Sequence, residues 1–399
     1  MQLKDKRILL GVTGGIAAYK AVELLRLLKK AGADVNVMMT DSAQEFLTRT
    51  TFEVLSENPV LTNLYFGAES AIKHIDLAAR ADAAVIAPAT ANAIGKFARG
   101  IADDAMTTTM LAVTCPVMIC PSMNTDMYQN IRVQRNLDIL EKDGWQISDP
   151  DSGVLACRAH GPGRLPEPDF IFDRVEAMLT PKDLSGKNIL ISAGPTIEAI
   201  DPVRFISNHS SGKMGYAIAR AAEKRGATVT LVSGPVNLDP PAGVSCLAVE
   251  SCREMAALMT QNLDTAHIII KVAAVADYRP VAPRKSKIKK QDRSKALSIE
   301  LTENPDILKM IGQKKSDHQF LVGFAAETND LEKYALMKMK KKNLDMIAVN
   351  PVGEPDAGFK ADTNKVRLFF RDGTAFDIPL MSKAQMADIL IDEIIKKTG

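Results

Sequence analysis

The chain has 399 residues, of which 46% are hydrophobic and 25% charged, and its net charge is +2. This length predicts two domains, and the hydrophobic content is sufficient for a core in each, which excludes a disordered chain. The near-neutral charge provides no general attraction to nucleic acid, and no apolar stretch approaches the length that spans a bilayer. The five cysteines show no paired-ligand spacing, so we expect a cytoplasmic protein without disulfides or structural zinc.

Two stretches of the chain repeat one pattern, in which a buried strand is followed by a glycine turn, a helix and a second strand. The first is residues 7–40 and the second is residues 188–233. The repetition predicts two nucleotide-type α/β domains joined end to end, which we place at residues 1–181 and 182–399. A hairpin around the Asp-Gly pair is expected to close the second domain at residues 366–378.

The first glycine turn suits an anion, because it places backbone N–H groups at a helix N-terminus. Its spacing, from Gly11 to Gly14 and Gly15, is G-x-x-G-G rather than the dinucleotide pattern G-x-G-x-x-G. No acidic residue ends the second strand, which leads instead into Thr40 and Ser42. A mononucleotide phosphate therefore fits better than a nicotinamide dinucleotide, although an ordinary tight turn explains the glycines equally well.

Polar side chains follow two further predicted strands of the first domain. The strand at residues 82–87 leads into residues 88–92, and the strand at residues 115–120 leads into Asn124. Ligands of open α/β sheets bind at these carboxyl ends. An Asn there can hold a carboxylate, but it can also cap the next helix. His74 precedes the first of these strands, and a single histidine is more often structural than catalytic.

Residues 144–168 are rich in glycine and proline, and no regular element is predicted there. They contain Cys157, with Arg158, His160 and Arg164 close in sequence. Positive charges lower the pKa of a thiol, and a thiol on a loop is accessible. The pattern fits a proton-donating or reactive thiol on a flap, and the alternative is an ordinary surface loop with an incidental cysteine.

Positive charges gather in the second half of the chain. A basic run at residues 284–295 follows the predicted strand at residues 267–272, while Lys338 and Lys342 lie four residues apart on one helical face. Such a run is usually a solvated loop. Its position after a strand end nevertheless favours closure over a polyphosphate. Without interleaved aromatic residues, it is a poor platform for single-stranded nucleic acid.

Several short motifs occur together and in order over nearly the whole chain. They are His74, PSMNTDM at 121–127, Cys157, SNHSSGKMG at 207–215, AAVADYR at 273–279, KIKK at 287–290, NPDIL at 304–308 and GFAAET at 323–328. With them the chain resembles the bifunctional phosphopantothenoylcysteine decarboxylase / phosphopantothenate–cysteine ligase family of coenzyme A biosynthesis. The resemblance implies two Rossmann-like three-layer α/β domains, the first with the flavodoxin-like fold of flavin-dependent cysteine decarboxylases and the second a ligase domain.

For the first domain, the resemblance implies an FMN-dependent decarboxylation of 4′-phosphopantothenoylcysteine to 4′-phosphopantetheine. His74 is then the base, Asn124 anchors the substrate carboxylate and Cys157 donates a proton. The residues expected to bind FMN are Gly14, Gly15, Thr40, Ser42, Ala89 and Thr90. Tyr128 and the residues after Cys157 depart from the family pattern.

For the second domain, the resemblance implies ligation of 4′-phosphopantothenate to cysteine with CTP and Mg²⁺, through an acyl-cytidylate. Asn208 is expected to orient the acyl phosphate, and Lys287 is the catalytic cation. The residues expected to contact CTP are Ala273, Asp277, Lys287, Pro305, Asp306, Ile307, Leu308, Phe324, Lys338 and Lys342, while the Mg²⁺ ligands are not assigned. Relatives of the first half form trimers with the flavin between subunits and those of the second form dimers, which by analogy indicates a homo-oligomer, a closed dodecamer.

Two other functions compete with this interpretation. A two-domain nicotinamide oxidoreductase is disfavoured, because the dinucleotide fingerprint fails in both halves. A flavin-binding regulatory or scaffold protein predicts the loss of His74, Asn124 or Cys157, and all three are present.

Overall fold

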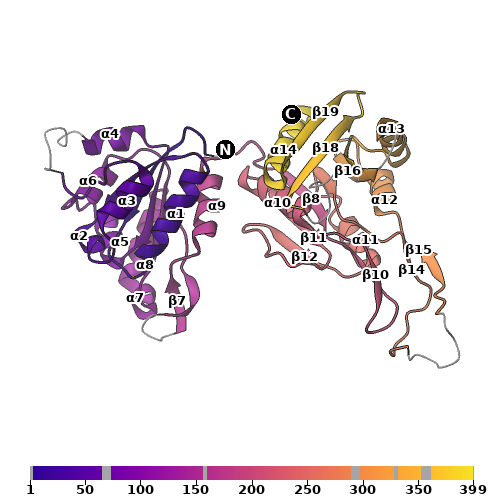
Figure 1. Cartoon of the computed structure of the whole chain (residues 1–399), viewed down its shortest axis with the longest axis horizontal. Coiled ribbons are helices and arrows are strands. Elements are labelled where there is room, and N and C mark those ends of the chain that lie inside the picture. Colours follow the sequence, from indigo (N-terminus) through magenta and orange to yellow (C-terminus); the bar gives the residue numbers. More distant parts are fainter. Residues whose placement is uncertain are drawn as a thin grey trace. The chain divides into compact units, whose positions relative to one another are not determined.

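The computed structural model describes residues 3–64, 73–155, 160–288, 297–327, 331–351 and 361–398. The chain divides into two compact units, Met1–Thr180 and Pro181–Gly399 (Figure 1). Each unit contains its own sheet, with helices against it.

The first unit is built on a five-stranded parallel sheet in the order β2-β1-β3-β4-β5. Its strands are β1 (Arg7–Val12), β2 (Asp34–Met39), β3 (Ala83–Ala89), β4 (Val117–Pro121) and β5 (Gln146–Ile147). Strands β1 and β3 are buried almost throughout, as expected of parallel strands covered on both faces. The order is that of flavodoxin-like sheets, whose switch point lies between β1 and β3.

Helices cover both faces of this sheet and give three layers. One face packs against α1 (Ala18–Lys30), α3 (Arg49–Ser56) and α9 (Pro168–Leu179). The other packs against α4 (Lys73–Arg80), α5 (Ala91–Arg99), α6 (Ala105–Leu111) and α8 (Ile131–Lys142). Alternate residues of β1 reach the two cores, Ile8 and Leu10 on one side and Leu9 on the other.

The glycine-rich segment after β5 is a hairpin, so the prediction of no regular element at residues 144–168 was wrong. Strand β6 (Asp151–Val154) pairs antiparallel with β7 (His160–Arg164). The hairpin docks beside the short helix α7 (Thr125–Gln129), where Met123 N donates to Gly163 O at 3.1 Å. A Cβ on Gly163 would overlap the Met123 carbonyl oxygen. This glycine therefore allows close docking rather than marking an irregular loop.

The second unit is built on an eight-stranded sheet in the order β12-β11-β8-β13-β16-β17-β18-β19. The first six strands run parallel, and β18 and β19 add the predicted antiparallel hairpin. The strands are β8 (Asn188–Ala193), β11 (Thr228–Ser233), β12 (Ser245–Ala248), β13 (Ile268–Lys271), β16 (Phe320–Glu327), β17 (Met346–Pro351), β18 (Thr363–Phe370) and β19 (Ala375–Ser382). Counted along the unit, the parallel strands follow the Rossmann order 3-2-1-4-5-6, with its switch point between β8 and β13.

Two helical layers enclose this sheet as well. Helices α10 (Lys213–Lys224) and α14 (Lys383–Thr398) cover one face, while α11 (Cys252–Gln261), α12 (Ile307–Lys314) and α13 (Leu331–Lys342) cover the other. Ile268 and Ile270 of β13 pack towards α10 and α14, and Ile269 packs towards α11–α13. Both units thus confirm the predicted three-layer α/β fold.

Two short ribbons lie at the edge of the second unit. Strand β9 (Ile197–Ala199) pairs with β10 (Phe205–Ser207), and β14 (Tyr278–Pro280) pairs with β15 (Leu301–Glu303). Of the helices that the structure describes, none has both the length and the apolar character needed to cross a bilayer.

Candidate active sites

Two adjoining cavities lie at the carboxyl ends of β1 and β3, at the switch point of the first sheet. The first, of about 490 Å³, has mainly apolar walls and is called the apolar cavity here. Its lining residues include Gly14, Gly15, Tyr19, Thr90, Met123, Asn124, Leu155 and Leu165. The second, the polar cavity, has about 500 Å³ and is lined by residues that include Gly14, Thr40, Asp41, Ser42, Thr90, Asn92, Lys96 and Thr107.

Two hydrogen bonds join distant parts of the chain beside these cavities. The Thr13 hydroxyl donates to Pro88 O at 2.8 Å and accepts from Thr90 N at 3.0 Å, so the turn after β1 is tied to the end of β3. A Cβ on Gly14 would lie 2.7 Å from the backbone carbon and oxygen of Ser42. Glycine is required at position 14 because the backbone that follows β2 passes directly over it.

The two predicted threonines begin helices at the polar cavity. Thr40 Oγ1 accepts from Ala43 N at 3.2 Å, and Thr90 Oγ1 accepts from Ala93 N at 3.4 Å. The N-terminus of α5, which follows Thr90, therefore adjoins this cavity and favours an anion there. Ala89 is fully buried in β3 and is not among the described residues that line either cavity. The other five residues predicted to bind FMN do line them.

Asn124 caps helix α7 and also lines the apolar cavity. Its Oδ1 accepts from Asp126 N at 2.8 Å and from Met127 N at 3.4 Å. The two alternatives for this residue are therefore compatible. The amide oxygen serves the helix, and the amide NH₂ group is the part that can donate to a carboxylate.

His74 and Cys157 are not brought to the cavities by the described structure. His74 lies on α4, outside the described walls of both cavities, and its Nδ1 is buried with no hydrogen-bond partner among the described residues. Cys157 itself lies outside the described residues. The hairpin strands on either side of it contribute Val154 and Gly163 to the apolar cavity.

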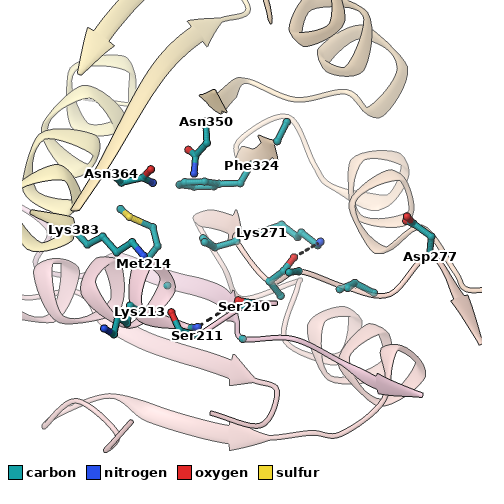
Figure 2. Close-up of a pocket in the computed structure, with 18 of the residues that line it drawn as sticks. Ser210, Ser211, Lys213, Met214, Lys271, Asp277, Phe324, Asn350, Asn364 and Lys383 are labelled. Atoms are coloured by element: carbon teal, nitrogen blue, oxygen red, sulfur yellow. Dashed lines mark hydrogen bonds between the residues drawn. The ribbon is translucent and has the colours of Figure 1, made fainter. Parts of the chain in front are cut away.

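The second unit has a cavity of about 350 Å³ at the carboxyl ends of β8 and β13 (Figure 2). We call it the switch-point cavity of the second unit. Its lining residues include Gly194, Ser210, Ser211, Lys213, Met214, Lys271, Ala273, Asp277, Phe324, Lys338, Asn350, Asn364 and Lys383. The first turn of α10 forms part of this wall, so the positive end of a helix dipole faces the cavity.

One end of this cavity collects amide and amine groups. Figure 2 shows Asn350, Asn364 and Lys383 near the ring of Phe324 and the side chain of Met214. Lys383 is only 6% exposed, and burial lowers its pKa. The Oδ1 of Asn350 is buried without a hydrogen-bond partner among the described residues.

Four of the residues predicted to contact CTP line this cavity, and another group lies beside it. Ala273, Asp277, Phe324 and Lys338 are in the wall. The turn at residues 305–308 is held next to Asp277, because Asn304 N donates to Asp277 O at 2.8 Å.

Within that turn, each residue has a structural partner. Asp306 accepts from Lys309 N at 3.1 Å and pairs with Lys342 at 3.0 Å. Ile307 and Leu308 are buried in the core on the α11–α13 side, and Pro305 O accepts from the Cys252 thiol.

Asn208 and Lys287 both lie outside the described wall of the cavity. Asn208 Nδ2 donates to Ala274 O at 3.2 Å and to Val275 O at 3.0 Å, so its loop is tied to residues that do line it. Lys287 is exposed. The next residue, Ile288, is fixed by its N–H, which donates to Asp201 Oδ2 at 3.1 Å.

Lys271 is a cavity residue that the motifs did not predict. It ends the apolar strand β13, and its Nζ donates to Ala273 O at 2.6 Å. Burial lowers its pKa to about 8. The signal in the sequence was a single lysine closing an otherwise apolar run at a carboxyl strand end, immediately before the recognised motif at residue 273. No group of three or more metal-binding side chains occurs in the part of the chain that the structure describes.

Comparisons with known proteins find matches for both units. Residues 1–180 match the family model described as Flavoprotein, and residues 184–398 match the model described as DNA/pantothenate metabolism flavoprotein C-terminal domain. Over 405 residues the chain is 48% identical to the coenzyme A biosynthesis bifunctional protein CoaBC of Bacillus subtilis, which covers 100% of this chain and 99% of the relative.

Two solved structures are similar to single units. The C-terminal domain of a coenzyme A biosynthesis bifunctional protein CoaBC is 42% identical, covers 54% of this chain and 97% of that chain, and has a TM-score of 0.46. An FMN-dependent cysteine decarboxylase, SpaF, is 33% identical, covers 44% and 97%, and has a TM-score of 0.39. The match to the relative over its full length confirms the resemblance predicted from the motifs. The chain therefore belongs to the family of bifunctional coenzyme A biosynthesis proteins, enzymes in which a decarboxylase domain is joined to a ligase domain.

Proposed function

We propose that the chain makes 4′-phosphopantetheine in two steps, with the ligase in residues 182–399 and the decarboxylase in residues 1–181. The ligase joins 4′-phosphopantothenate to cysteine at the expense of CTP. The decarboxylase then removes the cysteine carboxylate of the product, 4′-phosphopantothenoylcysteine. The observation that supports this proposal best is that each unit has a cavity at the switch point of its own sheet, lined by residues of the recognised motifs.

The ligase step begins with activation, because a carboxylate is a poor electrophile. A carboxylate oxygen of 4′-phosphopantothenate attacks the α-phosphorus of CTP, and the bond to the bridging oxygen breaks to release pyrophosphate. The cysteine amine then attacks the acyl carbon and displaces CMP, and the nitrogen loses a proton as the amide forms. We assign Lys338 and Lys342, with Lys287, to the negative charge on the triphosphate, and Asn208 to orientation of the acyl phosphate.

We propose that Mg²⁺ enters this site with the triphosphate. Mg²⁺ in nucleotide sites is held largely by phosphate oxygens and water, with few protein ligands. Its protein ligands stay unassigned.

We propose that FMN binds at the two cavities of the first unit, through Gly14, Gly15, Thr40, Ser42 and Thr90, with Ala89 beneath. The residues present fit this group. The apolar walls suit a flat ring system, while the threonine and serine hydroxyls and the N-terminus of α5 suit a phosphate. Because Gly14 has no Cβ, the turn can lie close to the backbone at Ser42.

Decarboxylation of the cysteine end needs an acceptor for the electron pair that CO₂ leaves behind. Bound FMN would supply this redox chemistry, with oxidation of the substrate thiol to a thioaldehyde before CO₂ leaves and return of the electrons afterwards. Asn124 holds the carboxylate through its NH₂ group until the C–C bond breaks. His74 accepts a proton early in the cycle, and Cys157 donates one to carbon at the end.

We propose that the chain is a homo-oligomer, and the position of His74 supports this. His74 is outside the described walls of both cavities of its own unit, so a neighbouring copy would supply it if the flavin lies between subunits. Trimers of the first unit and dimers of the second combine into a closed dodecamer. Light scattering on the purified chain measures this mass. The expected cytoplasmic location stays a prediction.

The two activities can be tested separately on the full chain. With 4′-phosphopantothenate, CTP and Mg²⁺ but no cysteine, we expect pyrophosphate release and an acyl-cytidylate detectable by mass. With synthetic 4′-phosphopantothenoylcysteine alone, we expect CO₂ without any CTP. A colourless protein that neither releases pyrophosphate nor produces CO₂ would contradict the proposal.

A further inference from the structure

Lys271 occupies a central place in the switch-point cavity of the second unit. It is the last residue of β13, which lies between β8 and β16 in the sheet. Because side chains alternate along a strand, Lys271 shares the face of Ile269, which is the face covered by α11, α12 and α13. In Figure 2 its side chain lies between Phe324 and Asp277 and turns back to the chain after its own strand.

The charges around Lys271 come from each element on that face. The negative groups that act on it are Asp306 at the start of α12, Asp277 after the strand, and the thiol of Cys252 on α11 when ionised. The positive group is Lys342 on α13, which is itself paired with Asp306 at 3.0 Å. Lys271 is therefore in electrostatic contact with three positions already assigned to the nucleotide.

The ammonium group of Lys271 is poorly compensated in this setting. Its hydrogen bond within the described structure goes to the Ala273 carbonyl at 2.6 Å, which is a neutral partner. Burial, followed by the positive charge of Lys342, lowers the pKa of Lys271 to about 8. A partly buried amine beside a cavity gains its missing compensation when a polyanion enters that cavity.

We propose that Lys271 is an anion-binding residue of the nucleotide site, which takes up a proton when a nucleoside triphosphate binds. The proposal rests on the CTP-dependent ligase function above and adds a residue that lies outside the motifs that predicted the site. Lys271 thereby couples nucleotide binding to pH, with tighter binding at neutral than at alkaline pH.

The sign of this coupling follows from the charges. A triphosphate near the amine favours its charged form and raises the pKa of Lys271. Between the unbound and bound pKa values, binding therefore takes up protons, and the affinity for CTP falls as the pH rises. Each unit by which the nucleotide raises the pKa corresponds to about a tenfold loss of affinity at high pH.

The test is calorimetric titration of the full chain with CTP and Mg²⁺, without cysteine or 4′-phosphopantothenate, in two buffers of different ionisation enthalpy at pH 8. The phosphates of CTP are already ionised there, since a phosphate monoester has its second pKa near 6. The pKa of Lys271 is about 8, so the amine is partly protonated near this pH and the wild type should take up a fraction of a proton per site.

Three variants complete the test. Lys271→Met removes the amine at similar volume, so the proton uptake should disappear and the affinity at pH 7 should fall about tenfold or more. Lys271→Arg keeps a permanent charge, so it should bind CTP without proton uptake and with little pH dependence. The matched control is Lys340→Met, which removes an exposed lysine of α13 and should behave as the wild type.

The outcomes separate this proposal from the function on which it rests. If CTP binds the wild type and Lys271→Met with equal affinity and equal proton uptake, Lys271 has no role in binding, although the ligase function stands. If the wild type neither binds CTP nor releases pyrophosphate from it, the ligase function itself fails. Should Lys271→Met not fold, retained proton uptake in Lys271→Arg would still overturn the proposal.

Discussion

Substituting Gly14 by alanine tests the construction of the flavin site most directly. The added Cβ would lie 2.7 Å from the backbone carbon and oxygen of Ser42. These are backbone atoms of the short helix α2 (Asp41–Gln44), which follows β2, so they cannot move aside by a change of rotamer. Overpacking of this kind costs about 1–3 kcal/mol. We expect the first unit of Gly14→Ala to be destabilised by that amount and to bind FMN more weakly.

The neighbouring Gly15, which is also assigned to the flavin, provides a matched control for packing, because alanine keeps the backbone N–H group of the turn. A Cβ on Gly15 would meet only Thr90 Cγ2, at 4.0 Å. Its substitution by alanine should leave stability within about 0.5 kcal/mol of the wild type or raise it slightly through the unfolded state. Both variants keep the second unit intact, so CTP-dependent pyrophosphate release should not change.

The assay is urea unfolding, followed by flavin absorbance and by circular dichroism. We expect the flavin of Gly14→Ala to be released at a lower urea concentration than that of Gly15→Ala and the wild type. If Gly14→Ala and Gly15→Ala retain flavin equally and unfold at the same urea concentration, the close approach of Ser42 does not shape this site.

Three further predictions concern single residues. Lys287→Gln should abolish CTP-dependent amide formation and spare the decarboxylase, and unchanged ligation would remove Lys287 from the triphosphate site. Cys157→Ser should bind flavin and evolve CO₂ but not yield 4′-phosphopantetheine, and normal product would exclude it as the proton donor. The unfolded state holds the Lys271 proton more tightly than the folded state, so stability should rise as the pH increases from about 8 towards the ordinary lysine value. Lys271→Met should lose this rise in chemical denaturation at several pH values, whereas an unchanged rise would mean that another group is responsible.

The parallel strands and their order along the chain were predictable because each is a continuous apolar run with a polar turn after it. Both switch-point cavities follow from that order, and Thr90 and Phe324 are among the residues that line them. The β6–β7 hairpin was missed because its glycines, such as Gly163, resemble those of an irregular loop. Only the docked structure shows that they permit close contact with Met123.

Side-chain positions within the sites were less predictable than the elements that bear them. Lys342 carries the expected charge, but in the structure it pairs with Asp306 and is not among the described residues that line the cavity. Lys271 was not predicted, because a lysine at the end of a strand looks like a solvent-facing boundary residue. It is partly buried on the face of Ile269, where α11–α13 are brought against the strand from distant parts of the chain.

The central claim is that one chain both joins cysteine to an activated carboxylate and removes the carboxylate of that same cysteine. The most direct measurement supplies 4′-phosphopantothenate, CTP, Mg²⁺ and cysteine labelled with ¹³C in its carboxyl group, and follows CMP and labelled CO₂ together. The account predicts one labelled CO₂ for each CMP and unlabelled 4′-phosphopantetheine as the final product. Formation of CMP with the label retained in the product, or release of labelled CO₂ without CTP consumption, would contradict it.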